Sequence, residues 1–152
     1  MHPFPHRYSV SARTTSNGAP HVTSPGLPSL DTAAPVEFDG PGGRWSPEAL
    51  LVAAVADCLA LTFCGIARAS RLPFLSFTCD VTGTLDRLGR GASEFTEFHV
   101  YARVELPHDA NAEQARRVIM KAEENCLVTR SLKGAVHLTI EVDVEAREMA
   151  AV

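Results

Sequence analysis

The chain has 152 residues, of which 45% are hydrophobic and 21% are charged, and its formal net charge is −4. This length and composition are typical of a globular protein, and we expect one domain over residues 1–152. The acidic balance and the absence of a Lys/Arg block argue against a nucleic-acid partner.

Signals for membrane insertion or export are weak. Asp57 interrupts the longest apolar run, which therefore falls short of the about 18 uncharged residues that a membrane helix needs. The first residues, MHPFPHRYSV, lack the apolar core of a signal peptide. We therefore expect no membrane segment and a cytoplasmic location. In that reducing compartment the four cysteines are either buried hydrophobic residues or reactive thiols.

The N-terminal part of the chain predicts a hairpin followed by a loop. Residues 1–6 are expected to form a flexible end. The hairpin is predicted by three features: alternation over residues 7–14, a turn at residues 16–18 and a short strand at residues 21–23. Residues 24–43 are rich in proline and glycine, so they predict a long loop of the kind that is often functional or packed on a partner.

Residues 45–71 form the longest apolar stretch and predict a central, largely enclosed helix. Ser46 can cap the first turn and Pro47 suits the first helical position. Pro73 and the residue before it oppose further helix. Few positions on this helix are charged, so one chain is not expected to cover it, and a dimer that buries the helix between subunits is predicted.

The C-terminal part predicts strands and one amphipathic helix. Residues 74–87 and 94–106 alternate as a hairpin with one buried face. Residues 112–125 repeat apolar side chains at helical spacing, and residues 136–144 alternate as a strand. Residues 146–152 are expected to form a flexible end. Because the strands come in hairpins, we predict an α+β fold with antiparallel sheet.

Several side chains could carry chemistry, although each has an ordinary structural explanation. Glu48 lies in the first helical turn, where the helix dipole favours a carboxylate by about 0.3–1 kcal/mol. Cys58 lies on an apolar stripe, where a cysteine is most often a core residue. Cys126 follows polar residues at a helix end, so we expect a partly exposed thiol. The histidines show no metal-ligand spacing; His99 and His137 are expected to be solvated strand residues, and no metal site is predicted.

Two motifs resemble signatures of the OsmC/Ohr family. RWSPEALLVAAVADCLALTF resembles the family's central helix, with Pro-Glu at its start and a cysteine ten residues after the glutamate. KAEENCLVTRSLKGAVHLTIEVDV resembles the second signature, a helix ending in a cysteine, a Ser/Thr-Lys/Arg-rich turn and the closing strand. The resemblance covers about Tyr8 to Val144. It implies antiparallel sheets wrapped around long central helices in an intertwined homodimer.

The resemblance also implies a function. The best-known members of the family are antioxidant, stress-response peroxidases that use thiols to reduce organic hydroperoxides. By this resemblance Cys58 is the peroxidatic cysteine, Cys126 is the resolving cysteine and Glu48 orients an activating arginine. The implied partners are a second copy of the chain, an organic hydroperoxide and an external dithiol reductant such as a lipoylated protein, with no cofactor.

The sequence departs from the family at two places. The family keeps its arginine in the turn after the first strand, where this chain has Thr15-Ser16-Asn17-Gly18-Ala19, so Arg13 and Arg44 become the candidate cations. The proline that commonly follows the second cysteine is replaced by Leu127. Two alternatives therefore stay open. One is a non-catalytic OsmC-like dimer that binds a small apolar molecule or senses redox state, and the other is a structural dimer with inert cysteines.

Overall fold

The computed structural model describes residues 2–89 and 91–146. Residues 1–51 and residues 52–152 form two compact units, which are considered in turn. Met1 and residues 147–152, within the predicted flexible ends, lie outside the described residues. Arg90, between the two strands of the hairpin predicted at residues 74–87 and 94–106, also lies outside them.

The first unit contains a small antiparallel sheet. Strands β1 (Ser11–Arg13) and β2 (His21–Thr23) pair as the predicted hairpin, and β3 (Leu30–Asp31) adds to the other edge of β2. The Gly18 amide donates to the Thr15 carbonyl at 3.2 Å and closes the hairpin turn. The single loop predicted for residues 24–43 is therefore wrong in part, because this segment supplies β3 and the short 3-10 helix Val36–Phe38.

Helix α1 (Pro47–Ala69) begins and ends where the sequence predicts. The Ser46 hydroxyl accepts a hydrogen bond from the Ala49 amide at 3.1 Å, which satisfies one of the free donors of the first turn. After the last turn, Arg71 has a left-handed φ of 53°, and Pro73 follows two residues later. A residue in that conformation is a common way for a helix to end.

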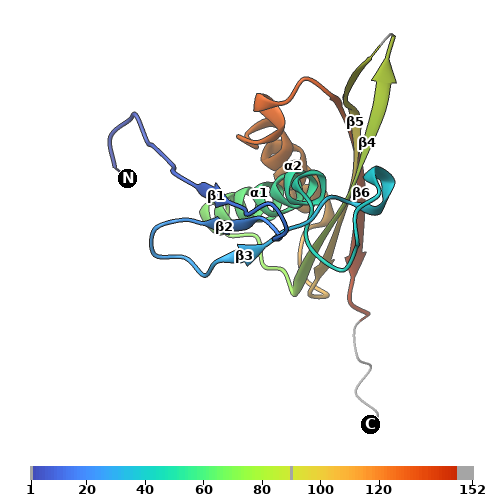
Figure 1. Cartoon of the computed structure of the whole chain (residues 1–152). Coiled ribbons are helices and arrows are strands. Elements are labelled where there is room, and N and C mark those ends of the chain that lie inside the picture. The colour runs from blue at the N-terminus through green and yellow to red at the C-terminus, as the bar shows by residue number, and fades with distance from the viewer. Residues whose placement is uncertain (1, 90, 147–152) are drawn as a thin grey trace. The chain divides into compact units, whose positions relative to one another are not determined.

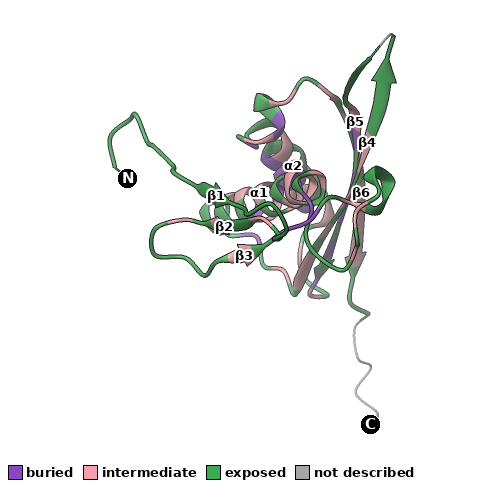
Figure 2. Cartoon of the chain, viewed as in Figure 1, coloured by how far each residue is buried: buried purple, intermediate pink, exposed green. Residues whose placement is uncertain are grey.

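Within one chain, α1 buries only one stripe of side chains. The fully buried positions repeat every four residues: Val55, Leu59, Phe63 and Ala67. Figure 2 colours the whole chain by burial, with buried residues in purple. Leu61, on another face, is 65% exposed. The single chain therefore leaves much of α1 uncovered, as the sequence led us to expect, and enclosure of the helix by a second copy stays a prediction.

The apolar character of α1 also bears on whether this helix could span a membrane. The helix is long and apolar enough to cross a membrane, judged by length and composition alone. Asp57 does interrupt the uncharged run, but the helix remains apolar enough overall to meet this test. One such helix is weak evidence for a membrane span, because core helices of soluble proteins meet the same test.

The second unit contains a sheet in the order β4-β5-β6 (Figure 1). Strands β4 (Ser76–Leu88) and β5 (Ala92–Leu106) form the predicted antiparallel hairpin. Helix α2 (Ala112–Glu124) leads to β6 (Ala135–Val144), which pairs with β5 in parallel. The prediction of a purely antiparallel sheet was therefore wrong. The connection through α2 is long enough for a crossover, which a parallel neighbour requires.

One face of this sheet supplies the core. Alternate residues of β5 are at most 3% exposed: Phe98, Val100, Ala102, Val104 and Leu106. The buried side of α2 consists of Ala115, Val118, Ile119 and Ala122. The Asn111 side chain caps α2 by accepting a hydrogen bond from the Gln114 amide at 3.0 Å. The other face of the sheet carries the polar side chains that alternate with the core residues of β5.

Candidate functional site

Cys58 lies near the middle of α1, next to the buried stripe. Its residue is half-buried and its thiol is free. The Thr62 hydroxyl donates to the Cys58 carbonyl at 2.7 Å, so Thr62 is anchored to the helix backbone. The Cys58 thiol also interacts with the thiol of Cys126, whose pKa it helps to raise. Two cysteines that are far apart in the sequence therefore meet in the second unit.

Cys126 follows the end of α2 and is fully buried, so the expectation of a partly exposed thiol is wrong. The adjacent polar residues lie on the solvent side of the helix end, while Cys126 turns inward. Burial raises the pKa of the Cys126 thiol, and hydrogen bonding from Thr129 opposes that rise. The Thr129 hydroxyl also donates to the Cys126 carbonyl at 3.1 Å. This cysteine is therefore held in a defined position and kept protonated.

A third cysteine, Cys79, lies near the pair. It is on the inward face of β4, opposite Ala102 of β5. Burial raises the pKa of the Cys79 thiol to about 11, and the nearby Asp80 and Cys126 add to the effect. A thiol with this pKa is almost wholly protonated at neutral pH, so Cys79 is a poor nucleophile. The sequence gave no sign that Cys79 would lie close to Cys126.

Glu48 lies in the first unit, in the first turn of α1. Its Oε2 atom is buried and has no hydrogen-bond partner among the residues that the structure describes. Glu48 lines a cavity of about 570 Å³. The other walls of the cavity are mostly apolar and include Val10, Ala12, Val22, Ala33 and Phe38. A buried carboxylate oxygen without a partner is costly, so this group is suited to receiving a cation or a donor.

Neither candidate arginine pairs with Glu48. Arg44 lies near Asp31, whose pKa is lowered chiefly by a hydrogen bond from His21 Nδ1 at 2.6 Å and to a smaller extent by Arg44. Arg13 is exposed on β1, opposite His21. In the described residues, no ion pair involves Glu48, Arg13 or Arg44. The structure therefore does not bring the predicted glutamate–arginine pair together.

The chemistry available at Cys58 and Cys126 is thiol chemistry. Two neighbouring free thiols can be oxidised to a disulfide, and a half-buried cysteine beside a buried one gives an oxidant access to one sulfur first. The profile described as OsmC-like protein matches residues 40–141, which contain both cysteines, Glu48 and most of the second unit.

The chain belongs to the OsmC-like protein family. Among curated proteins, it is 28% identical over 114 residues to the uncharacterized protein YmaD from Bacillus subtilis (strain 168), covering 73% of this chain and 75% of that protein.

Solved structures share the fold of this OsmC-like protein. An OsmC-like protein of unknown function from Vibrio cholerae superposes with a TM-score of 0.80 at 20% identity, covering 90% of this chain and 99% of the other. An organic hydroperoxide resistance protein, OsmC, from Legionella pneumophila gives 0.73 at 23% identity, covering 93% and 100%. The expected OsmC-like α+β fold is thereby confirmed, and at these identities the likeness concerns the fold alone.

Proposed function

We propose that this OsmC-like protein is a thiol-dependent peroxidase that reduces organic hydroperoxides with Cys58 and Cys126. The observation that carries the proposal is the contact between a half-buried thiol and a fully buried one. The half-buried Cys58 is the cysteine that a substrate can reach. Cys126 lies beside Cys58, so it is placed for the second step, the condensation with an oxidised Cys58, and its raised pKa disfavours direct attack on the peroxide.

The proposed cycle has three steps. The Cys58 thiolate attacks the distal oxygen of ROOH, the O–O bond breaks, and the departing alkoxide takes a proton to give ROH. Cys58 is left as a sulfenic acid. The Cys126 sulfur then attacks the Cys58 sulfur, forming the S–S bond, and the hydroxyl leaves with a proton as water. An external dithiol, for example on a lipoylated protein, returns both cysteines to thiols by two exchanges and leaves as a disulfide.

The first step needs a thiolate, and an ordinary thiol with a pKa near 8.5 is only partly ionised at neutral pH. A cation beside the sulfur stabilises the thiolate form. We propose that Glu48 orients this cation. Arg13 and Arg44 are the candidates. The test is the pH dependence of Cys58 alkylation in Arg13→Gln and Arg44→Gln. The arginine whose loss moves the profile to higher pH is the cation, and unchanged profiles in both variants would exclude this role for either.

Disulfide mapping tests the peroxidase proposal. The reduced protein is mixed with one equivalent of cumene hydroperoxide, quenched with iodoacetamide after seconds and digested for mass spectrometry. We expect a Cys58–Cys126 disulfide and consumption of the peroxide. Cys64→Ser is the matched control, because Cys64 lies on the same helix and the link should form unchanged. Unmodified thiols beside unconsumed peroxide would rule the proposal out.

The cavity in the first unit favours a second candidate function, the binding of a small apolar molecule without catalysis. Its volume of about 570 Å³ and mostly apolar walls are typical of ligand pockets. The mapping experiment separates the two functions, because a non-catalytic binder would leave the hydroperoxide and all four thiols unchanged.

We further propose that the protein is a soluble, cytoplasmic homodimer in which a second copy covers α1. The helix has 23 residues, yet only 17% of its most apolar window is buried. Leaving such a face in water forfeits hydrophobic stabilisation of about 25 cal/mol per Å².

Analytical ultracentrifugation checks the dimer. We expect the wild-type mass to be that of two chains and Leu61→Glu to shift the protein toward monomer, because Leu61 is exposed on α1. Thr78→Glu, which adds the same charge at an exposed position of β4, should leave the dimer intact. A monomeric wild-type protein at micromolar concentration would contradict the proposal.

A further inference from the structure

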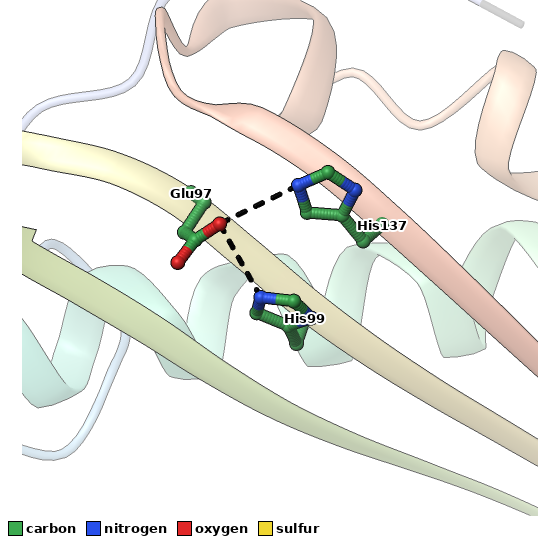
Figure 3. A group of neighbouring side chains, drawn as sticks. All are labelled: Glu97, His99 and His137. Atoms are coloured by element: carbon green, nitrogen blue, oxygen red, sulfur yellow. Dashed lines mark ion pairs between the residues drawn. The ribbon is translucent and has the colours of Figure 1, made fainter.

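Three polar side chains converge on the outer face of the second unit's sheet (Figure 3). Glu97 and His99 come from β5, and His137 comes from β6. The Oε2 atom of Glu97 lies 3.4 Å from Nε2 of His99 and 3.5 Å from Nε2 of His137. The two imidazole rings stack with centroids 4.8 Å apart and an interplanar angle of 26°. The three nearest atoms are therefore two ring nitrogens and one carboxylate oxygen.

The fold holds these residues at fixed positions. Glu97 and His99 are two residues apart on one strand, so they share a face, and His137 is directly opposite His99 in the parallel register. The residues that alternate with them, such as Phe98 and Val100, are buried in the core and lock the strand in place. A site built on paired strands is better defined than one built on a loop.

The sequence gave no hint of this arrangement. His99 and His137 were expected to be separate, solvated strand residues without metal-ligand spacing. Both are indeed about half exposed. However, His99 and His137 lie on two different strands, and only the structure shows the register that places them side by side.

The donor set is that of a borderline divalent metal ion. Imidazole nitrogen and carboxylate oxygen are standard ligands of zinc, at about 2.0–2.2 Å. In a tetrahedral site with such bonds, neighbouring ligand atoms are about 3.3–3.4 Å apart. The two measured nitrogen–oxygen separations are close to that value, and all three ligand atoms lie within 4.8 Å of one another. The two imidazole nitrogens lie within 4.8 Å of each other, so binding one ion requires the side chains to rotate until this pair also reaches that spacing.

We propose that Glu97, His99 and His137 form a binding site for a divalent transition-metal ion of the zinc class. Each imidazole coordinates through an unprotonated Nε2 and keeps its proton on Nδ1. Three protein ligands leave a fourth position to water or to a further ligand, as in zinc sites that are not closed. The exposure of the cluster gives the ion a direct route from solvent.

Ion pairing alone is a weaker explanation of the cluster. Exposed pairs of this kind contribute about 0–1 kcal/mol. Full charging of the cluster would also place two imidazolium rings face to face, and these repel each other. A single metal ion shared by both rings and the carboxylate removes that repulsion.

The proposed metal site is separate from the thiols. Cys79 and the core residues of β5 alternate onto the inward face of the sheet, while Glu97 and His99 alternate outward. The proposed metal site therefore does not depend on the proposed peroxidase activity.

Nuclear magnetic resonance of the histidine rings tests the site directly. Zinc chloride is titrated into the reduced, full-length protein while the ring nitrogen signals are followed. We expect the His99 and His137 signals to move together and to saturate at one ion per chain, with those of His21 and His108 unchanged. Zinc uptake that leaves the His99 and His137 signals unmoved would overturn the assignment, because the ion would then lie elsewhere, for instance on cysteines.

Calorimetry on matched variants gives an independent measure of affinity. His99→Gln and His137→Gln each remove one ligand at an exposed position. Each should weaken zinc binding by more than the about 10–100-fold that loss of an outer-shell partner costs. His108→Gln, an equally conservative change at another exposed histidine, should bind zinc like the wild type. Equal affinity in all three variants would also overturn the proposal.

Discussion

Replacing Cys58 by serine is expected to lower the rate of organic-hydroperoxide consumption at least about a thousandfold. A serine hydroxyl is not ionised at neutral pH and cannot be oxidised to a sulfenic acid, so the proposed first step is lost entirely. The change is nearly isosteric, and Cys58 is only half-buried, so the fold should be retained. The measurement is peroxide consumption with excess dithiol, at matched protein concentration and with circular dichroism as the check on folding.

Two further cysteine variants serve as comparisons for Cys58→Ser. Cys126→Ser should consume about one equivalent of peroxide and then stall or overoxidise, because no neighbouring thiol remains to condense with the sulfenic acid. Cys64→Ser should retain wild-type turnover. If Cys58→Ser consumed peroxide as fast as Cys64→Ser, Cys58 would not be the peroxidatic residue. If Cys126→Ser turned over normally, resolution would involve another thiol, and Cys79 is the nearest alternative on that side of the sheet.

The local features of the fold were largely predictable from the sequence. Ser46, Pro47 and Pro73 fixed the limits of α1 because capping and the loss of an amide donor act within one turn. The alternation along β5 identified its buried face because neighbouring side chains of a strand point in opposite directions. Such signals depend only on residues close together in the chain.

Features that depend on distant parts of the chain were not predictable. The alternation of β6 is the same whether its neighbour is parallel or antiparallel, so the parallel register with β5 was missed. Cys126 was expected to share the polarity of the residues before it, yet the end of α2 turns it into the core. Its meeting with Cys58 was anticipated through the family resemblance and not from spacing. The pairing of His99 with His137 had no local signal.

Removing a large side chain from the core of the second unit is expected to lower the stability of the protein strongly. Phe63→Ala is expected to lower the free energy of unfolding by about 3–5 kcal/mol. The Phe63 side chain is fully buried. Its ring stacks on Phe77 at a centroid distance of 4.0 Å and meets Phe74 edge-on at 5.1 Å. Alanine would remove both aromatic contacts and leave a cavity that the helix and β4 cannot close without moving backbone.

This loss is a large fraction of the about 5–15 kcal/mol that stabilises a typical domain. It corresponds to a fall in melting temperature of about 10 °C for a chain of this size. Phe4→Ala makes the same chemical change at a side chain that is 81% exposed, so it should alter stability by about 0.5 kcal/mol or less. Urea denaturation at a single protomer concentration is the measurement, because the proposed dimerisation would make apparent stability depend on concentration. Equal stability of the two variants would mean that Phe63 does not anchor α1 to β4.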